Sequence, residues 1–309
     1  MVDGPAGGRE VSRATLPGGL HRQATALLEA NWREPGFCVP NAVTYPWQWL
    51  WDSCFHAVCW AHLGRPDRAI AELDHALAHQ SPAGFVPHLT YWGDELRHAD
   101  FWGRAGTSSI TQPPMYGHAL AELHRRGCTI PDDLVDRATR GLHHLLAARH
   151  RPGVGPVILH PWESGCDDSP RWDPWCPSPW SFARWKGEKG VLVVDDDVAV
   201  AAALADIGDD AAFGGRFGPP ATRRDEASYD PTAYWRGPAW PQLTYLCWVA
   251  ANRRGDRRAA DWLAGRLVDG ARRSGFAEYW HPDTGQALGA VPQTWAALAA
   301  VVAGQAPRA

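Results

Sequence analysis

The acidic residues best suited to chemistry lie in a short segment near the middle of the chain. Residues 160–172 read HPWESGCDDSPRW, so three carboxylates stand within six residues and between two tryptophans. Gly165 and Pro170 disfavour a continuous helix, and a loop is therefore expected. Indole faces can pack on the C–H surface of a sugar, and a partly apolar pocket lets a carboxylic acid keep its proton. The segment fits a sugar-cleaving site and a solvated acidic turn about equally well.

Two later segments combine aromatic residues with a single charged group. Residues 229–242 read YDPTAYWRGPAWPQ, and Arg236 there could hold a carboxylate through two parallel hydrogen bonds. The alternative is an aromatic cluster packed under a loop, with Arg236 paired to a local acid. Residues 275–285 read GFAEYWHPDTG, which places Glu278 in apolar company, where an unpaired charge is expensive. A surface glutamate with aromatic neighbours is the alternative there.

The composition describes a soluble globular protein and excludes several classes of partner. The 309 residues, 45% of them hydrophobic, can form one large domain or two smaller ones. A net charge of -4 provides no basic surface, so nucleic acid and anionic membranes are not expected as partners. No apolar run approaches the roughly 18 residues of a membrane span or the core of a signal peptide. We expect a cytoplasmic protein.

Two residue types stand out in this composition. The seven cysteines show no CxxC spacing, which indicates idle thiols in a reducing compartment. The 18 tryptophans are several times the usual share, although aliphatic residues fill a core more flexibly. Tryptophan at this density is useful where a flat apolar face must meet a polar ligand.

The elements that must position these loops are helices. Residues 1–19 are rich in glycine, proline and polar residues and are expected to form a flexible leader. Apolar residues at helical spacing, with proline and acidic residues at the starts, predict about nine helices. Their approximate ranges are 20–32, 54–62, 66–77, 112–126, 132–150, 198–204, 238–252, 257–274 and 291–303. The second of these is expected to follow an aromatic loop, residues 45–53, and to be capped by Asp52 or Ser53.

These helices come in pairs, and no long run alternates apolar and polar residues as a substantial sheet would require. The prediction is one all-α domain over residues 20–309, built as a toroid of helical hairpins. Such a toroid gathers its loops at one end, where the acids and aromatic rings would meet.

Taken together, four segments resemble glycoside hydrolase family 63 and its bacterial relatives that hydrolyse mannosylglycerate and glucosylglycerate. They are WLWDS at 49–53, ESGCDDSPRW at 163–172, YWRGP at 234–238, and Glu278-Tyr279 followed by Thr284-Gly285. The four occur in the family's order and span residues 41–295, nearly the whole chain. The resemblance implies an (α/α)6 barrel that hydrolyses an α-glycosidic bond with inversion.

The resemblance also assigns roles to residues of this chain. It implies that Asp167 is the general acid and Glu278 the general base, which suits the two-carboxylate chemistry of inverting glycosidases. It implies no cofactor, and no cluster with metal-ligand spacing is seen in the sequence, so no metal is expected. Arg236 is the expected partner of an acidic leaving group such as glycerate. The expected substrate-binding residues are Trp49, Trp51, Asp52, His88, Gln112, Trp162, Tyr234, Trp235, Arg236, Trp240 and Trp295.

One region departs from the family pattern. The family carries a long segment with further barrel helices where this chain has only residues 206–228, which are rich in glycine and proline. The nine expected helices fall short of the barrel's twelve by about what that segment would supply. We therefore expect a barrel that lacks some helices between about residues 206 and 228. A homo-oligomer that covers the shortened side is a further hypothesis.

Three other functions compete with an inverting glycosidase of small α-glycosides. A trehalase-like hydrolase would use a related barrel and a similar pair of acids. An inactive carbohydrate-binding remnant would keep the aromatic cleft without turnover. A sugar isomerase of similar shape is a weaker alternative, because such enzymes depend on paired histidines and these loops supply carboxylates.

Overall fold

The computed structural model describes residues 17–153, 155–173, 190–191 and 206–304, and within these ranges helices dominate. The α-helices are α1 (Pro17–Asn31), α2 (Leu50–His62), α3 (Pro66–Ala76), α4 (Ala99–Trp102), α5 (Tyr116–Arg125), α6 (Asp132–Arg149), α8 (Pro241–Arg253), α9 (Arg257–Ser274) and α10 (Leu298–Ala303). Short 3-10 helices are η1 (Pro161–Ser164), η2 (Pro170–Trp172) and η4 (Thr294–Ala297). In this part of the chain, no helix is long and apolar enough to span a membrane.

Strands are short antiparallel pairings between loops. They are β1 (Trp32–Arg33), β2 (Phe37–Cys38), β3 (Gln48–Trp49), β4 (Leu89–Thr90), β5 (His150–Arg151), β6 (Gly155–Ile158), β7 (Gly190–Val191), β8 (Tyr279–Trp280) and β9 (Ala287–Leu288). β1 pairs with β2, β3 with β4 and β8 with β9, while β5, β6 and β7 form a three-stranded ladder. The expectation that the described residues hold no substantial sheet is confirmed.

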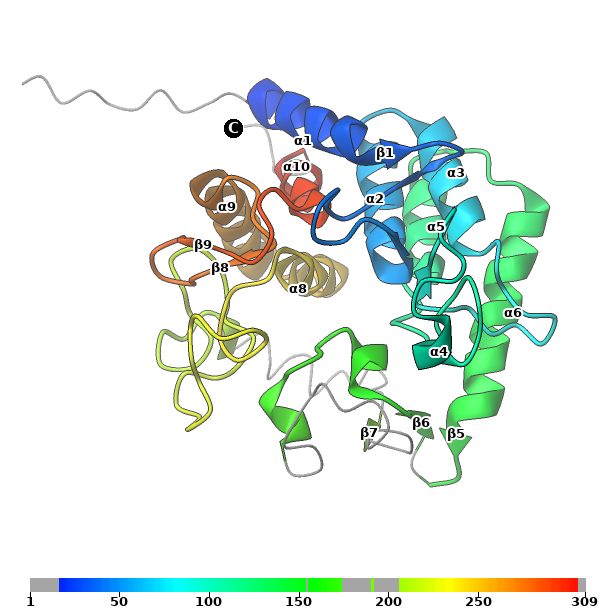
Figure 1. Cartoon of the computed structure of the whole chain (residues 1–309). Coiled ribbons are helices and arrows are strands. Elements are labelled where there is room, and N and C mark those ends of the chain that lie inside the picture. Colours follow the sequence, from blue (N-terminus) through cyan, green and yellow to red (C-terminus); the bar gives the residue numbers. More distant parts are fainter. Residues whose placement is uncertain (1–16, 154, 174–189, 192–205, 305–309) are drawn as a thin grey trace, which may run out of the picture.

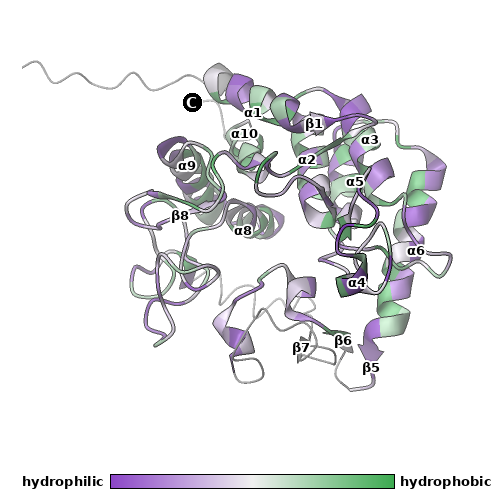
Figure 2. Ribbon diagram, in the orientation of Figure 1, coloured by the Kyte–Doolittle hydropathy of each residue, from purple (hydrophilic) through white to green (hydrophobic). Residues whose placement is uncertain are grey.

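The helices pack as hairpins around a shared core, and the chain is an all-α toroid (Figure 1). α2 packs against α3, α5 and α10, and α10 in turn packs against α1, α8 and α9. α2 is buried on every side from Leu50 to Ala61, which makes it a central helix. α9 buries a stripe with helical spacing that includes Leu263, Leu267 and Ala271, and Figure 2 shows its hydrophilic outer side.

Several predicted helix starts are wrong by a few residues. α2 begins at Leu50 instead of residue 54, because its first amides find distant partners in place of a local cap. Leu50 N donates to the His88 carbonyl oxygen at 2.9 Å, and Trp51 N donates to Gln112 Oε1 at 3.2 Å. Neither Asp52 nor Ser53 is the N-cap; that position is Trp49, with no side-chain cap bond.

Prolines explain two further differences. α5 begins at Tyr116 instead of residue 112, since Gln112 precedes two prolines and a residue before proline avoids the helical conformation. α8 begins at Pro241, which occupies the first turn, instead of residue 238.

α1 begins at Pro17, within the expected leader. The remainder of that leader, residues 1–16, and the helix expected at 198–204 lie outside the described residues.

The glycine-rich and proline-rich segment after residue 207 contributes no helix up to the start of α8. Residues 208–240 are turns and loops. Two ion pairs hold this segment, Arg223 with Asp206 at 2.6 Å and Arg224 with Asp283 at 2.6 Å. Its end is fixed by Ala239, which exchanges backbone hydrogen bonds with Trp280 of β8 at 2.8 and 3.1 Å. The segment therefore packs beside the strand that follows Glu278.

Candidate active site

Loops at one end of the toroid enclose a cavity with two compartments. The outer compartment is about 850 Å³ and the inner one about 60 Å³. Six of the described residues line both compartments, which shows that the two adjoin: Tyr45, Trp49, Gln112, Asp167, Tyr234 and Glu278. Asp167 and Glu278 are the carboxylates of this shared set. Asp52 lines only the inner compartment and Asp168 only the outer.

A tight turn presents Asp167 to the cavity. The turn follows η1 and passes through Gly165, whose φ is 73°, a conformation that side chains disfavour. A Cβ at Gly165 would lie 2.5 Å from Trp51 Cη2, so glycine also allows the close approach to that ring. The Ser164 hydroxyl donates to the Pro161 carbonyl oxygen at 2.6 Å, and Cys166 N donates to Ser164 Oγ at 3.0 Å. These bonds define the direction of the chain just before Asp167.

The glutamate of the same segment has a structural role. Glu163 is buried, and its Oε1 accepts a hydrogen bond from Arg149 Nη2 at 2.7 Å. Its Oε2 accepts from Leu159 N at 2.7 Å. Arg149 is the last residue of α6, so this ion pair ties the loop to that helix. Of the segment's three carboxylates, Glu163 anchors the loop and Asp167 faces both compartments.

Glu278 is held from two sides. The Tyr45 hydroxyl donates to its Oε1 at 2.9 Å, and Ala290 N donates to its Oε2 at 2.8 Å. Gly289 has φ of 68°, and a Cβ there would collide with Glu278 Oε2. The absence of a side chain at Gly289 therefore leaves room for the carboxylate beside β9.

These surroundings affect the pKa values of Asp167 and Glu278 differently. Burial raises the pKa of Asp167 well above its usual range, and the charge of Glu278 raises it further. Burial also raises the pKa of Glu278, but the hydrogen bonds from Ala290 N and the Tyr45 hydroxyl lower it. Burial therefore favours the protonated form of Asp167, while two hydrogen bonds favour the ionised form of Glu278.

Asp52 forms part of the floor of the inner compartment. The side chain is 3% exposed, and its Oδ1 has no hydrogen-bond partner among the described residues. Burial is the main cause that raises the pKa of Asp52 to about 7, while the charge of His56 opposes the shift. An acceptor without a partner, aimed into a small polar compartment, suits a ligand hydroxyl.

Aromatic rings form the walls of both compartments. Trp49 lies edge-on to His88, with ring centroids 5.3 Å apart, and His88 Nδ1 lies 2.6 Å from Ser108 Oγ. Burial lowers the pKa of His88 to about 3, so this imidazole is neutral. Trp51 meets Trp295 edge-on at 5.8 Å beside the inner compartment.

Most of the predicted binding residues line the cavity. Trp49, Gln112 and Tyr234 line both compartments, while His88 and Trp162 line the outer one. The inner compartment also has Trp51, Asp52, Trp235 and Trp295 in its wall.

Two predicted binding residues lie outside the cavity wall. Trp240 is fully buried and stacks behind Trp235, with centroids 3.7 Å apart and planes at 4°. Trp235 has φ of 60°, a strained conformation for a residue with a side chain, and this stack supports it. Arg236 binds Asp168 and Asp173 with its guanidinium, at 3.2 and 2.7 Å. The structure thus shows Arg236 paired to local acids, and its contact with an acidic leaving group stays a prediction.

The prediction missed other residues of the site. Tyr45 lies in the aromatic segment 45–53, so its type gave a signal, but its bond to Glu278 spans 233 positions. Gln293 lines the inner compartment and carries no local signal. Trp102 and Tyr91 line the outer compartment and are joined by a hydrogen bond of 2.8 Å from Trp102 Nε1 to the Tyr91 hydroxyl.

Comparison with known proteins agrees with this architecture. A crystal structure of the GH63 mannosylglycerate hydrolase from Thermus thermophilus, in complex with Tris and D-glycerate, superposes with a TM-score of 0.72. The match covers 91% of this chain and 99% of that chain at 21% sequence identity, so it concerns the fold. The fold is therefore of the type found in toroidal all-α glycoside hydrolases.

Sequence comparison identifies the family. Residues 45–188 and 191–296 match the mannosylglycerate hydrolase MGH1-like glycoside hydrolase domain, and the chain belongs to this family. The mannosylglycerate hydrolase of Thermus thermophilus is 37% identical over 174 residues, which cover 49% of this chain. The glucosylglycerate hydrolase of Mycolicibacterium hassiacum is 24% identical over 435 positions, which cover 92% of this chain and 97% of that protein.

The length of the match differs between these relatives. The chain spans 40% of the length of the Thermus thermophilus hydrolase that it matches. The 435 aligned positions in the Mycolicibacterium protein exceed the 309 residues of this chain, so many of its residues face gaps here. The family match is interrupted at residues 189–190, ahead of the segment 206–228 in which the shortening was expected.

Proposed function

We propose that the protein is an inverting glycosidase that hydrolyses a small α-glycoside, with Asp167 as general acid and Glu278 as general base. Relatives named as mannosylglycerate and glucosylglycerate hydrolases support glycosides of this kind as substrates. This chain spans less than half of the first of these relatives. Both the hydrolytic activity and the roles of the two residues are therefore part of the proposal.

The observation that carries the proposal is the position of the two carboxylates. Asp167 and Glu278 alone, among the acids of the described cavity, line both the inner and the outer compartment. A glycoside with its sugar in the inner compartment and its leaving group in the outer one would place the scissile bond at this boundary. An acid and a base at the boundary could then act on opposite sides of the anomeric carbon.

The chemistry follows from the protonation states. Asp167 donates its proton to the glycosidic oxygen as the bond from that oxygen to the anomeric carbon breaks. Glu278 accepts a proton from a water molecule, whose oxygen forms the new bond to the same carbon. The products are an alcohol and a sugar of inverted anomeric configuration. The aromatic walls exclude water elsewhere and strengthen these charge interactions.

Proton NMR of reaction mixtures tests the function directly. The purified protein is mixed in parallel with mannosylglycerate, glucosylglycerate and trehalose, and the anomeric signals are followed at early times. We expect the β-anomer to be formed first from one substrate. Asp167→Asn and Glu278→Gln should each lower kcat by about 10²- to 10⁴-fold, the usual contribution of a general acid or base.

A matched control and two contrary outcomes make the experiment decisive. Asp225→Asn changes an exposed acid that lines neither compartment and should keep kcat within about threefold of the wild type, in the range of ordinary surface substitutions. First release of the α-anomer would contradict inversion. Sugar binding without turnover, unchanged in the Asp167 and Glu278 variants, would indicate a carbohydrate-binding remnant.

One observation favours a neutral second sugar as an alternative leaving group. Neither lysine nor arginine lines the outer compartment in the part of the chain that the structure describes, and Arg236 is paired elsewhere. A trehalase-like hydrolase therefore stays the second candidate. The trehalose arm of the NMR experiment distinguishes it, because a neutral disaccharide would then be cleaved faster than either glycerate glycoside.

A further inference from the structure

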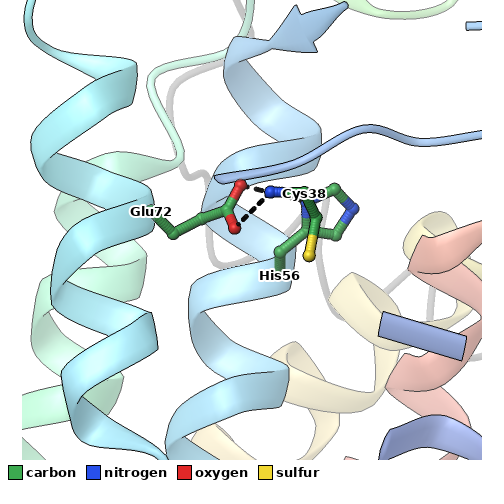
Figure 3. A group of neighbouring side chains, drawn as sticks. All are labelled: Cys38, His56 and Glu72. Atoms are coloured by element: carbon green, nitrogen blue, oxygen red, sulfur yellow. Dashed lines mark hydrogen bonds and ion pairs between the residues drawn. The ribbon is translucent and has the colours of Figure 1, made fainter. Parts of the chain in front are cut away.

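Behind the inner compartment lies a buried polar cluster that sequence analysis did not identify. Figure 3 shows Cys38 from β2, His56 from α2 and Glu72 from α3, which point toward one another between the helices. Their donor atoms lie within 4.8 Å of one another, and all three side chains are fully buried. Among the residues that the structure describes, this is the one cluster with the composition of a metal site.

The hydrogen bonds of the cluster disfavour a metal. Glu72 Oε2 accepts from Cys38 N at 2.8 Å, and its Oε1 accepts from the Ser53 hydroxyl at 2.7 Å. Cys38 Sγ donates to the Leu28 carbonyl oxygen at 3.4 Å, and burial raises the pKa of this thiol well above its usual range. A thiol that holds its proton and a carboxylate with both oxygens occupied have no need of an ion.

His56 connects this cluster with the cavity. Its Nδ1 lies 3.2 Å from Glu72 Oε1, and its Nε2 lies 2.6 Å from Thr294 Oγ1. The Thr294 hydroxyl is 3.2 Å from two acceptors, the Pro40 carbonyl oxygen and Gln293 Oε1. A hydroxyl that donates to one of these must accept from His56 Nε2, while the carboxylate accepts from Nδ1. When Thr294 donates to one of these acceptors, both ring nitrogens of His56 act as donors, which is the arrangement of an imidazolium ion paired with the buried Glu72.

His56 stands next to an acid of the inner compartment. Asp52 and His56 are four residues apart on α2, so both side chains lie on the same face of that helix. Gln293, which accepts from Thr294, also hydrogen-bonds the Asp52 side chain. His56 can therefore act on Asp52 in two ways. Its charge acts directly through space, and the hydrogen bonds of Thr294 and Gln293 connect the two side chains.

We propose that His56, held by Glu72 and Thr294, is a positioning residue that keeps Asp52 an ionised and correctly oriented acceptor for a sugar hydroxyl. The inference rests on the proposed function, because it assigns a role to the inner compartment as the sugar subsite. His56 itself lines neither compartment and acts only through Asp52. Loss of its charge should allow Asp52 to take up a proton and lose its value as an acceptor.

Other titratable groups near Asp52 and His56 also affect the pKa of Asp52, and the experiment must distinguish their effect from that of His56. Across the inner compartment, negative charge from Glu278 also acts on Asp52. The titratable groups around the pair are Glu278, Asp167, Tyr45 and Tyr234 in the cavity wall, and Glu72 and Cys38 behind α2. Of these groups, Glu278 disfavours ionisation of Asp52, and a positive charge on His56 opposes that effect.

The test compares His56→Gln with the wild type in the hydrolysis assay. Glutamine keeps an amide donor but removes the charge. We expect KM to rise about tenfold at neutral pH, and the acidic limb of kcat/KM to move up by about one pH unit, as a pKa shift of that size requires. The sign follows because Asp52 must be ionised, and its pKa rises when a neighbouring positive charge is lost. His118→Gln is the matched control, a part-buried histidine bonded to Tyr245 of α8.

A second variant and a second readout keep the inference independent of folding and of turnover. Thr294→Val removes only a hydroxyl, and should change KM and the acidic limb in the same direction by a smaller amount. Binding of D-glucose and D-mannose, followed by tryptophan fluorescence against pH, reports on the inner compartment without turnover. If, as the pH falls, His56→Gln loses sugar binding at a higher pH than the wild type, the inference is supported even without hydrolysis of any glycoside. Folded variants with unchanged KM, binding and acidic limb would overturn it.

Discussion

A backbone hydrogen bond distinguishes Glu278 from Asp167. Both carboxyl groups are surrounded by apolar rings, and burial raises the pKa of each. Glu278 receives a backbone amide and the Tyr45 hydroxyl, whereas Asp167 receives the Tyr234 hydroxyl and faces further negative charges. Because donors stabilise the ionised form and neighbouring carboxylates oppose it, small local differences can set opposite proton states in one cavity.

At this scale Tyr45→Phe is an informative change. Loss of the hydroxyl removes one donor from Glu278, so the pKa of Glu278 rises and the base becomes protonated at a higher pH. The acidic limb of kcat/KM should move up by about one pH unit, in line with the strength of a hydrogen bond to a charged group. A pH profile of kcat/KM checks this. Tyr116→Phe, which changes a buried tyrosine of α5 outside the cavity, should leave the profile in place.

At the scale of elements, side-chain anchors between distant segments set the direction of each loop. The loop that carries Asp167 is tied to α6 by the ion pair between Glu163 and Arg149, with exposed fractions of 2% and 14%. The first two backbone amides of α2 donate to groups on other loops, the His88 carbonyl oxygen and the Gln112 side chain. These anchors explain why short loops can hold the catalytic candidates without regular structure of their own.

Glu163→Gln tests the anchor of the Asp167 loop. The substitution leaves the Arg149 charge without a carboxylate in a buried position, so the free energy of unfolding should fall by about 3 kcal/mol. Urea denaturation measures this. Asp67→Asn breaks the exposed pair with Arg65 and should change the free energy of unfolding by less than about 1 kcal/mol. Equal effects of the two variants would argue against Glu163 as an anchor.

At the scale of the whole molecule, the two ends of the described chain close the toroid together. α10 packs against α1 and α2, and Asn41 Nδ2 donates to the Pro292 carbonyl oxygen at 2.7 Å. The bond from His56 to Thr294 spans 238 positions. Closure by these contacts gives the shortened chain one continuous core that runs from α1 to α10.

Val301→Asp tests this closure. Val301 of α10 is 1% exposed, so the variant buries a charge without a partner and should lower the free energy of unfolding by at least about 4 kcal/mol. Circular dichroism during thermal unfolding would show a large fall in Tm or loss of the cooperative transition. The same substitution at Val135, which is 41% exposed on α6, should have little effect. A Val301 variant with the wild-type Tm would contradict a closing role for α10.

Local patterns determined much of the architecture. Apolar residues at helical spacing, together with prolines at helix starts, predicted the all-α fold and most helices to within a few residues. Residue type also marked loops that line the cavity, although the acidic loop at residues 160–172 fitted a solvated turn equally well. Glu278, Asp167 and Asp52 all line the cavity that the structure shows.

Tertiary structure alone decided the direction and the partner of each side chain. Glu163 and Asp167 share one loop, yet one anchors α6 and the other faces the cavity. Arg236 and Trp240 are in a predicted binding segment, but an ion pair and a ring stack hold them away from the cavity wall. Tyr45, Gln293 and His56 join the site through contacts across the fold. Sequence spacing determines which residues share an element, whereas packing between elements determines what each side chain meets.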